Sequence, residues 1–261
     1  MPLFPLIKSC YRAYLQVLEN IEGFRTLHSS PPALRYAQLR FSKDKHIIEV
    51  LKRILWHFNT PFTFFDIGAE IGYHSVAAAK WARTRATIFS FEPNPELFEV
   101  LSLNAKHHKG IHPQLVALFD HDLATQAAPV ITGDHFIQEQ HIEYVDLVKI
   151  NTAAASLETL KGLKKTFERA EKIALILEFD AQNLTIAGHS LRDLYETLIG
   201  LGLDLHCTDS SAEETMFILL NDAEHLAQLG IEHLIGFKGY TKSEIYALLG
   251  CTDPNTPPEE D

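Results

Sequence analysis

A run of ten residues, FFDIGAEIGY at positions 64–73, constrains this chain more than any other feature. An apolar segment ends in an acid, Asp66, and two glycines, Gly68 and Gly72, come after it with three residues between them. Further along, a second apolar segment ends in another acid, Glu92. A buried strand, a glycine turn and a helix in this order place a loop at the edge of a parallel sheet. The run therefore predicts a binding site for a nucleotide-like cofactor.

The segments around this run alternate between short apolar stretches and amphipathic ones. The apolar stretches are continuous, as in strands that are buried on both faces of a sheet. The pattern predicts an α/β fold with a doubly wound, mostly parallel sheet. Strands are expected at 62–67, 86–91, 113–118, 144–150 and 173–179, and helices at 71–83, 95–107, 133–141, 155–169 and 188–201. A closing hairpin is expected from 203–207 and 216–220, followed by a last helix at 241–249.

Breaks in the pattern divide the chain into three regions. We expect residues 1–42 to form an N-terminal helical extension, which the run Ser-Ser-Pro-Pro at 29–32 separates from the rest of the chain. We expect residues 43–250 to form a Rossmann-like domain. Residues 251–261 are acidic and proline-rich with nothing to bury, so we expect a disordered tail.

The amino-acid composition argues against several classes of binding partner. With 46% hydrophobic residues among 261, the chain can bury one full core. A net charge of −11 argues against a nucleic-acid partner. No apolar run of spanning length exists in the sequence, so we expect no stable membrane insertion. The three cysteines are far apart and show no metal-ligand spacing, which indicates a protein of the reducing cytoplasm without a metal site. No pattern indicates an oligomeric state.

The glycine spacing discriminates between cofactors. A dinucleotide-binding loop has glycines as G-x-G-x-x-G, whereas Gly68 and Gly72 lack a glycine between them that would admit a pyrophosphate. A smaller anion such as a carboxylate fits better. Glu92 stands where an acid would bind the two hydroxyls of a ribose. Adenosine together with a carboxylate describes S-adenosylmethionine.

Three stretches resemble the FkbM-type S-adenosylmethionine-dependent methyltransferases. They read FFDIGAEIGYHSVAAA, then FSFEPNPELFEVLSLNAK, then YVDLVKI followed by LETLKG, and together they cover about residues 45–180. The resemblance implies a class I methyltransferase-like three-layer sandwich. It also implies methyl transfer to a hydroxyl of a sugar or another small molecule. The cofactor-binding residues that it implies are Asp66, Gly68, Ala69, Glu70, Gly72, Glu92, Pro93, Asn94 and Phe119.

The chain departs from this family at two functional places. The family usually has asparagine where this chain has Glu70, and a carboxylate there would repel the carboxylate of the cofactor unless it points to solvent. After Val148-Lys149-Ile150 the family continues Asp-x-Glu-Gly-x-Glu, whereas residues 151–156 read NTAAAS. Asn151 can form hydrogen bonds but cannot take a proton, so the usual acids of the fourth strand are missing.

Two functions remain open at this point. The first is a working O-methyltransferase whose base has moved elsewhere, and the second is a catalytically silent relative that binds a cofactor or serves as a scaffold. Lys149 is expected to meet the acceptor or to pair with Glu178. His121 and Asp122, after the third strand, are further candidates for the base. The residues that we expect to carry catalysis are Asn151, Glu178, Lys149 and His74.

Overall fold

The computed structural model describes residues 47–82, 85–123, 128–209, 216–220, 222–228 and 233–250. The expected extension over 1–42 and the expected tail over 251–261 lie outside these residues and stay predictions. Residues 47–57 are helical, and the apolar stripe that contains Ile47, Leu51 and Leu55 is buried. This amphipathic segment begins the described part of the domain.

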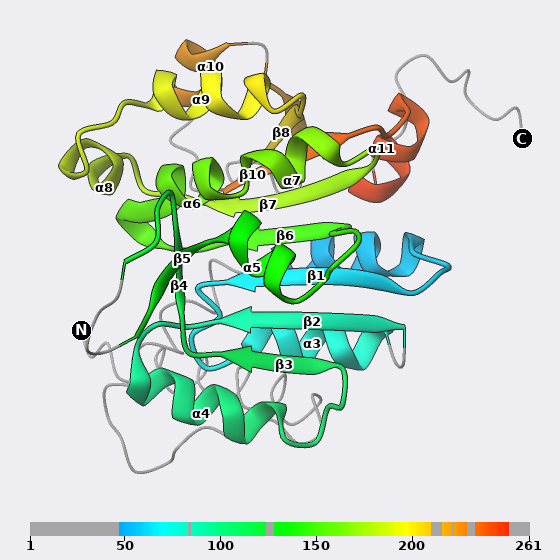
Figure 1. Ribbon diagram of the computed structural model, residues 1–261. Helices are drawn as coiled ribbons and strands as arrows, with labels where there is room; N and C mark the ends of the chain where they lie inside the picture. The colour runs from blue at the N-terminus through cyan, green and yellow to red at the C-terminus, as the bar shows by residue number, and fades with distance from the viewer. Residues whose placement is uncertain are drawn as a thin grey trace, which may run out of the picture.

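An eight-stranded sheet forms the centre of the molecule, in the order β3-β2-β1-β6-β7-β10-β8-β9 (Figure 1). Strands β3, β2, β1, β6 and β7 are parallel, whereas β10 runs antiparallel to both β7 and β8. The predicted doubly wound, mostly parallel sheet is confirmed. The strand bounds are β1 Phe62–Ile67, β2 Ala86–Phe91, β3 Ile111–Gln114, β6 Leu147–Ile150, β7 Ile173–Glu178, β8 Asp204–Asp209, β9 Met216–Leu219 and β10 His233–Lys238.

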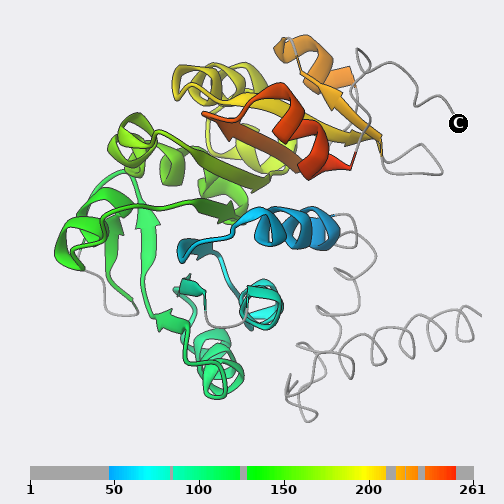
Figure 2. The same cartoon turned by 90° about the vertical axis from the view of Figure 1, so that its right-hand side faces the viewer.

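Helices cover both faces of the sheet, as Figure 2 shows. One face packs against the helix over 47–57, α3 and α11, and the other against α5, α6, α7 and α9. None of the helices in the described part of the chain is long and apolar enough to span a bilayer. The helix bounds are α3 Tyr73–Ala82, α4 Pro95–Ala105, α5 Gly133–Glu139, α6 Ser156–Gly162, α7 Lys164–Arg169, α8 Ala181–Ile186, α9 Leu191–Gly200, α10 Ala223–Gln228 and α11 Lys242–Leu249.

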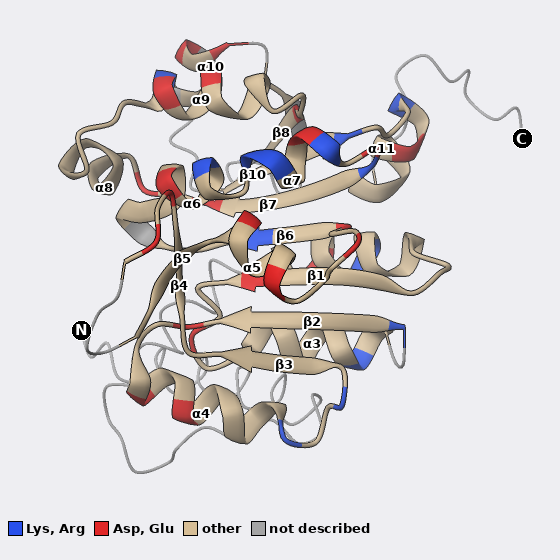
Figure 3. Cartoon of the chain, in the orientation of Figure 1, with Lys and Arg blue, Asp and Glu red and all other residues tan. Residues whose placement is uncertain are grey.

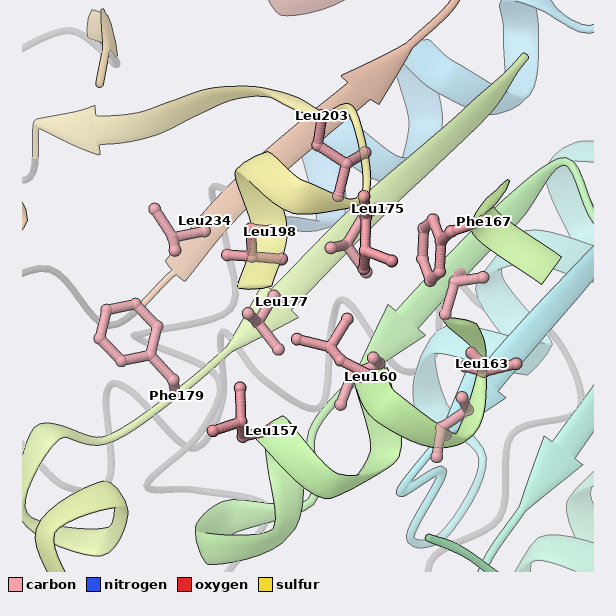
Figure 4. Packing of buried hydrophobic residues seen from close by; sticks show 14 of the residues in the cluster. Leu157, Leu160, Leu163, Phe167, Leu175, Leu177, Phe179, Leu198, Leu203 and Leu234 are labelled. Carbon is pink, nitrogen blue, oxygen red and sulfur yellow. The ribbon is translucent and has the colours of Figure 1, made fainter. Parts of the chain in front are cut away.

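Strand β7 lies between β6 and β10, and its side chains are at the centre of the hydrophobic core. Leu175 and Leu177 point from β7 toward side chains of the covering helices, among them Leu160 and Leu198 (Figure 4). All four of these leucines are fully buried. Burial of this kind stabilises by about 1.5–3 kcal/mol for each large side chain, which is why continuous apolar strands mark the middle of the sheet.

The strand expected at 113–118 is wrong in its extent. The chain forms β3, then bends, and continues as β4 over Ala117–Phe119. Strand β4 leaves the main sheet and pairs in parallel with β5, Val130–Thr132, in a separate two-stranded sheet. Pro113 lies in β3 at the edge of the main sheet, the place where a strand tolerates proline.

The single helix expected over 155–169 is also wrong, because two separate helices occupy this range. A short 3₁₀ turn over Ala153–Ala155 leads into α6, and α6 ends at Gly162 before α7 begins. A Cβ atom on Gly162 would lie 1.9 Å from the backbone oxygen of Phe119. The end of α6 therefore sits directly against β4, and Leu163 turns into the core at the break.

The closing hairpin is confirmed as β8 and β9, but the sequence reading missed β10, α8 and α10. Strand β10 inserts between β7 and β8, so the hairpin lies at the edge of the sheet and not next to β7. The insertion places His233, the first residue of β10, opposite Glu178 at the end of β7.

The buried His206 on β8 is expected to make folding stability fall in mild acid. Burial lowers the pKa of its imidazole from 6.5 to about 4. Below pH 6.5 the unfolded chain binds a proton at this residue that the folded chain does not bind, so stability decreases as the pH falls from 6.5 to 4. The expected loss is roughly 2–3 kcal/mol.

Chemical denaturation of the wild type and of His206→Phe between pH 7 and 4 measures this effect. Phenylalanine suits the site because the ring of His206 already stacks edge-on against Phe237 at 5.9 Å. The difference in stability between the two proteins should shift steadily in favour of the variant as the pH falls. A difference that does not change with pH would contradict the assignment.

Candidate functional site

The candidate site lies where the parallel strands end, between β1 and β6. Here the strand order reverses, because β2 and β3 extend the sheet on one side of β1 whereas β6 and β7 extend it on the other. Ligands of open α/β sheets bind at such a reversal. Asp and Glu border this edge, which is on the left in Figure 3.

Strand pairing places four residues level with one another near the ends of four adjacent strands. Ile67 is paired with both Phe91 and Ile150, and Ile150 is paired with Leu177. The residues that come directly after these four, one on each strand, therefore form a row along the edge. In sheet order they are Glu92, Gly68, Asn151 and Glu178.

Gly68 brings the glycine loop close to the end of β6. Its φ is +71°, and a Cβ atom there would lie 1.9 Å from the backbone oxygen of Asn151. The amides of Gly68 and Ala69 both donate to the carbonyl of Phe91, at 3.0 and 2.9 Å, which holds the loop against β2. Gly72 serves packing, since a Cβ atom on it would lie 2.6 Å from the side chain of Leu101 on α4.

Asp66 belongs to a buried network beneath the loop. Its carboxylate lies 3.1 Å from Nζ of Lys149 and accepts a hydrogen bond of 2.5 Å from Oγ of Ser75 on α3. The side chains of Asp66 and Lys149 are 0% and 3% exposed. Nζ of Lys149 also donates to the carbonyl of Gly68 at 3.3 Å. The expected pairing of Lys149 with Glu178 is wrong, because Asp66 lies on the adjacent strand on the same face.

Glu92 is buried and is held by two backbone amides. Oε2 accepts from the amide of Glu70 and Oε1 from that of Asn94, each at 2.9 Å. Burial raises the pKa of the carboxyl, and these two hydrogen bonds act in the opposite direction. Each carboxylate oxygen has two acceptor sites, so both retain one for a further donor. Asn94 caps α4, accepting from the amides of Glu96 and Leu97, and Pro93 is exposed.

The two departures from the family pattern touch each other. Glu70 has a left-handed backbone with φ of +53°, a conformation that asparagine adopts more readily. Its Oε1 accepts a hydrogen bond of 3.3 Å from Nδ2 of Asn151. The Glu70 carboxylate therefore turns toward the end of β6.

The other sequence-predicted residues lie on α3 and at or just after the end of β4. His74 is buried in the first turn of α3, and Phe119 is half-buried at the end of β4. His121 lies 2.6 Å from Asp120 and is exposed. Asp122 accepts from the amide of Thr132, and its other oxygen contacts His135, so it holds β5 in place.

Sequence reasoning missed two histidine–carboxylate pairs near this edge. Nε2 of His233 lies 3.9 Å from Oε2 of Glu178, and Nε2 of His189 contacts Oε1 of Glu158 on α6. The first pair depends on β10, an unrecognised strand whose signal was the apolar run HLIGFK at 233–238. No three His, Cys, Asp or Glu side chains in the described residues form a group that could hold a metal ion.

Comparison with known proteins gives one curated relative. The chain is 24% identical over 176 residues to the hexuronic acid methyltransferase AglP of Haloferax volcanii, a match covering 58% of this chain and 70% of that protein. No family model matches the chain.

Solved structures of several methyltransferases are similar in shape. Methyltransferase FkbM from Methylobacillus flagellatus shares 12% identity with a TM-score of 0.46, covering 88% of this chain but only 58% of that one. The plantazolicin methyltransferase BpumL, in complex with SAH, shares 10% identity with a TM-score of 0.47, covering 88% of this chain and 99% of the other. With its reversal between β1 and β6 and its antiparallel β10, this chain has the class I, Rossmann-like fold of S-adenosylmethionine-dependent methyltransferases.

Proposed function

We propose that this protein transfers a methyl group from S-adenosylmethionine to a hydroxyl oxygen of a sugar or another small molecule. The observation that carries the proposal is the row of residues at the strand ends. The Gly68 loop and Asn151 lie on the two sides of the reversal between β1 and β6, and the Glu92 carboxylate lies next to the loop at the end of β2. The sequence similarity to a hexuronic acid methyltransferase makes hexuronic acids the first acceptors to test.

The residues present fit this cofactor. The two oxygens of Glu92 each keep an acceptor site, which matches the two hydroxyls of a ribose. Gly68 lets the loop approach the backbone of Asn151 so closely that any side chain at this position would clash with it. Phe119 offers an aromatic surface for the adenine at the end of β4. When bound, S-adenosylmethionine supplies a methyl group that is already activated for transfer.

The chain must then position the acceptor and receive its proton. Asn151 orients through hydrogen bonds but cannot accept the proton. Glu178 lies on the next strand end, with His233 beside it. We assign proton acceptance to Glu178, because a carboxylate level with Asn151 faces the same side of the edge.

The alternative function is a catalytically silent protein that binds the same cofactor. The observation that favours it is the absence of an acid from residues 151–156. Positioning alone can still accelerate the reaction of an activated methyl group, so the missing acids lower the rate without excluding transfer.

Calorimetry with S-adenosylmethionine and S-adenosylhomocysteine, followed by transfer of labelled methyl groups to glucuronic acid and its glycosides, tests the proposal. Binding of both ligands and labelled sugar product would support an active enzyme. Binding without transfer to any acceptor would support the silent protein. If neither ligand binds at millimolar concentration, both assignments are wrong.

Restoring acids at the end of β6 is expected to increase the rate of transfer. In Asn151→Asp with Ala153→Glu, the carboxylate introduced at position 151 lies against Glu70 at the end of β6, where it can accept the proton of the acceptor hydroxyl. General-base help of this kind is worth roughly 10²–10⁴-fold. Single-turnover rates with saturating cofactor measure it.

The control for this experiment is Glu178→Gln in the wild-type background. If Glu178 is the working base, this variant loses transfer while cofactor affinity is retained. If the restored variant gains nothing and Glu178→Gln loses nothing, proton acceptance does not limit the rate and the assignment of Glu178 fails.

A further inference from the structure

A cavity of about 1210 Å³ lies between α5 and α7, which pack side by side on the face of the sheet turned to the viewer in Figure 1. Its lining includes residues 145–146, which directly precede β6, and residues 170–172, which directly precede β7. The candidate site uses Asn151 and Glu178, at the other ends of the same two strands. The cavity is therefore separate from the candidate site and lies toward the opposite edge of the sheet.

Backbone hydrogen bonds hold the walls of this cavity in place. The carboxylate of Asp134, in the first turn of α5, accepts from the amides of Lys165 and Thr166, each at 2.9 Å, and so joins the beginnings of α5 and α7. On the other side, the carboxylate of Asp146 accepts from the amide of Thr63 at 2.8 Å. A cavity that is already formed binds a ligand with a smaller loss of conformational freedom.

The side chains that border the cavity are mostly polar and carry both signs of charge. In Figure 3, basic residues predominate on α7 and acidic residues lie on α5. Lys172 is paired with Glu244 at 2.6 Å. The side chains of Arg169 and Gln138 form no hydrogen bond or ion pair with another described residue. Arg169 offers donors, Glu171 offers acceptors and Gln138 offers both, which suits an uncharged ligand rich in hydroxyls better than an apolar ligand or a polyanion.

Tyr144 adds an aromatic surface to this polar lining. It lies between α5 and β6 and is 68% exposed, so most of its ring is accessible. Its hydroxyl donates to the carboxylate of Glu143, which raises the pKa of the phenol and anchors one end of the ring. An accessible ring beside hydrogen-bonding groups offers a surface on which the C–H face of a sugar ring can pack.

We propose that this cavity is a second, non-catalytic binding site for an uncharged carbohydrate chain. A sugar ring packs on Tyr144, and Arg169 and Gln138 bond to its hydroxyls. The volume exceeds the roughly 300–1,000 Å³ of small-molecule pockets, so the cavity has room for more than one sugar unit. The inference goes beyond the proposed function, because the chain binds here whether or not a hydroxyl is methylated at the strand ends.

An array of neutral and uronate-containing oligosaccharides, probed with the labelled full-length protein, identifies the bound glycan. Backbone amide chemical shifts then locate it, and residues 138–146 and 165–172 should shift whereas Gly68 and Asn151 should not. Tyr144→Ala removes the stacking surface and should weaken binding by at least roughly tenfold. Arg169→Gln removes hydrogen-bond donors and should weaken it by roughly three- to tenfold.

Two control variants match these substitutions. Trp56→Ala removes another exposed aromatic side chain, 58% exposed on the helix over 47–57 and outside the cavity. Lys164→Gln removes a positive charge from α7, as Arg169→Gln does, but Lys164 does not line the cavity. Both controls should bind the glycan as the wild type does. Thermal unfolding of each variant establishes that it is folded.

Three outcomes would overturn the inference. The first is that the wild type binds no glycan on the array, or only glycans that carry uronates. The second is that a bound glycan shifts only the amides at the strand ends, which would assign it to the candidate site. The third is equal binding by the wild type and Tyr144→Ala. None of these measurements needs methyl transfer, so a failure of the proposed function is distinguishable from a failure of this inference.

Discussion

Replacing Lys149 with methionine is expected to lower the free energy of unfolding by about 3–5 kcal/mol. The substitution keeps the volume but leaves the Asp66 carboxylate, which is fully buried, without the cation 3.1 Å away. The Ser75 hydroxyl remains as a hydrogen-bond donor but carries no charge. Urea denaturation at pH 7 measures the loss. Cofactor affinity should fall as well, because Nζ of Lys149 also donates to the carbonyl of Gly68.

A double-mutant cycle decides whether this loss comes from the ion pair. Asp66→Asn combined with Lys149→Met removes both charges, so its cost should be clearly smaller than the two single costs added together. Costs that simply add would show that the two residues act independently, and Lys149 would then return to consideration as a residue that meets the acceptor.

Gly68→Ala is the second change with a large expected effect, a loss of at least about 3 kcal/mol in unfolding free energy. The new Cβ atom would lie 1.9 Å from the carbonyl oxygen of Asn151, and the backbone φ of +71° disfavours any side chain. The loop must move away from β6 to relieve the contact. Binding of S-adenosylmethionine should be lost together with stability, and calorimetry at a temperature where the variant stays folded tests this.

The variant Gly188→Ala separates the effect of the steric contact from the effect of the positive φ. Gly188 has a φ of +85°, but a Cβ atom there would meet nothing within 4 Å. This control should lose only the backbone contribution of about 1–2 kcal/mol and keep its cofactor affinity. If Gly68→Ala costs no more than Gly188→Ala, the close approach of the loop to Asn151 is not maintained in solution.

Much of the parallel half of the fold could be predicted from local pattern. The bounds of β1 and β2 agree with those read from the sequence, because each is a continuous apolar run with an acid at its end. Prediction failed where one segment pairs with two different strands. Residues 111–119 pair with β2 first and with β5 afterwards, and that division depends on distant strands.

The candidate site was predictable only as a set of positions. Strand ends placed Gly68, Glu92, Asn151 and Glu178 at one edge, and the register confirms that they lie level. Their partners were not predictable. His233 reaches Glu178 through β10, which pairs antiparallel with β7 after an excursion through the hairpin. No local sequence signal shows which of the many histidines will lie at this edge once the chain has formed the hairpin and turned back as β10.

The sequence by itself determined the order of buried strands and the residues at their ends, because burial on both faces and the glycine turn leave a local signature in residue type and spacing. Only the tertiary structure decided the contacts among those residues. It turned Lys149 toward Asp66 and not Glu178, and it brought the Glu70 carboxylate to Asn151. The physical reason is that charged side chains pair only when the distance between them is short. The register of the paired strands and the left-handed backbone of the loop determine those distances.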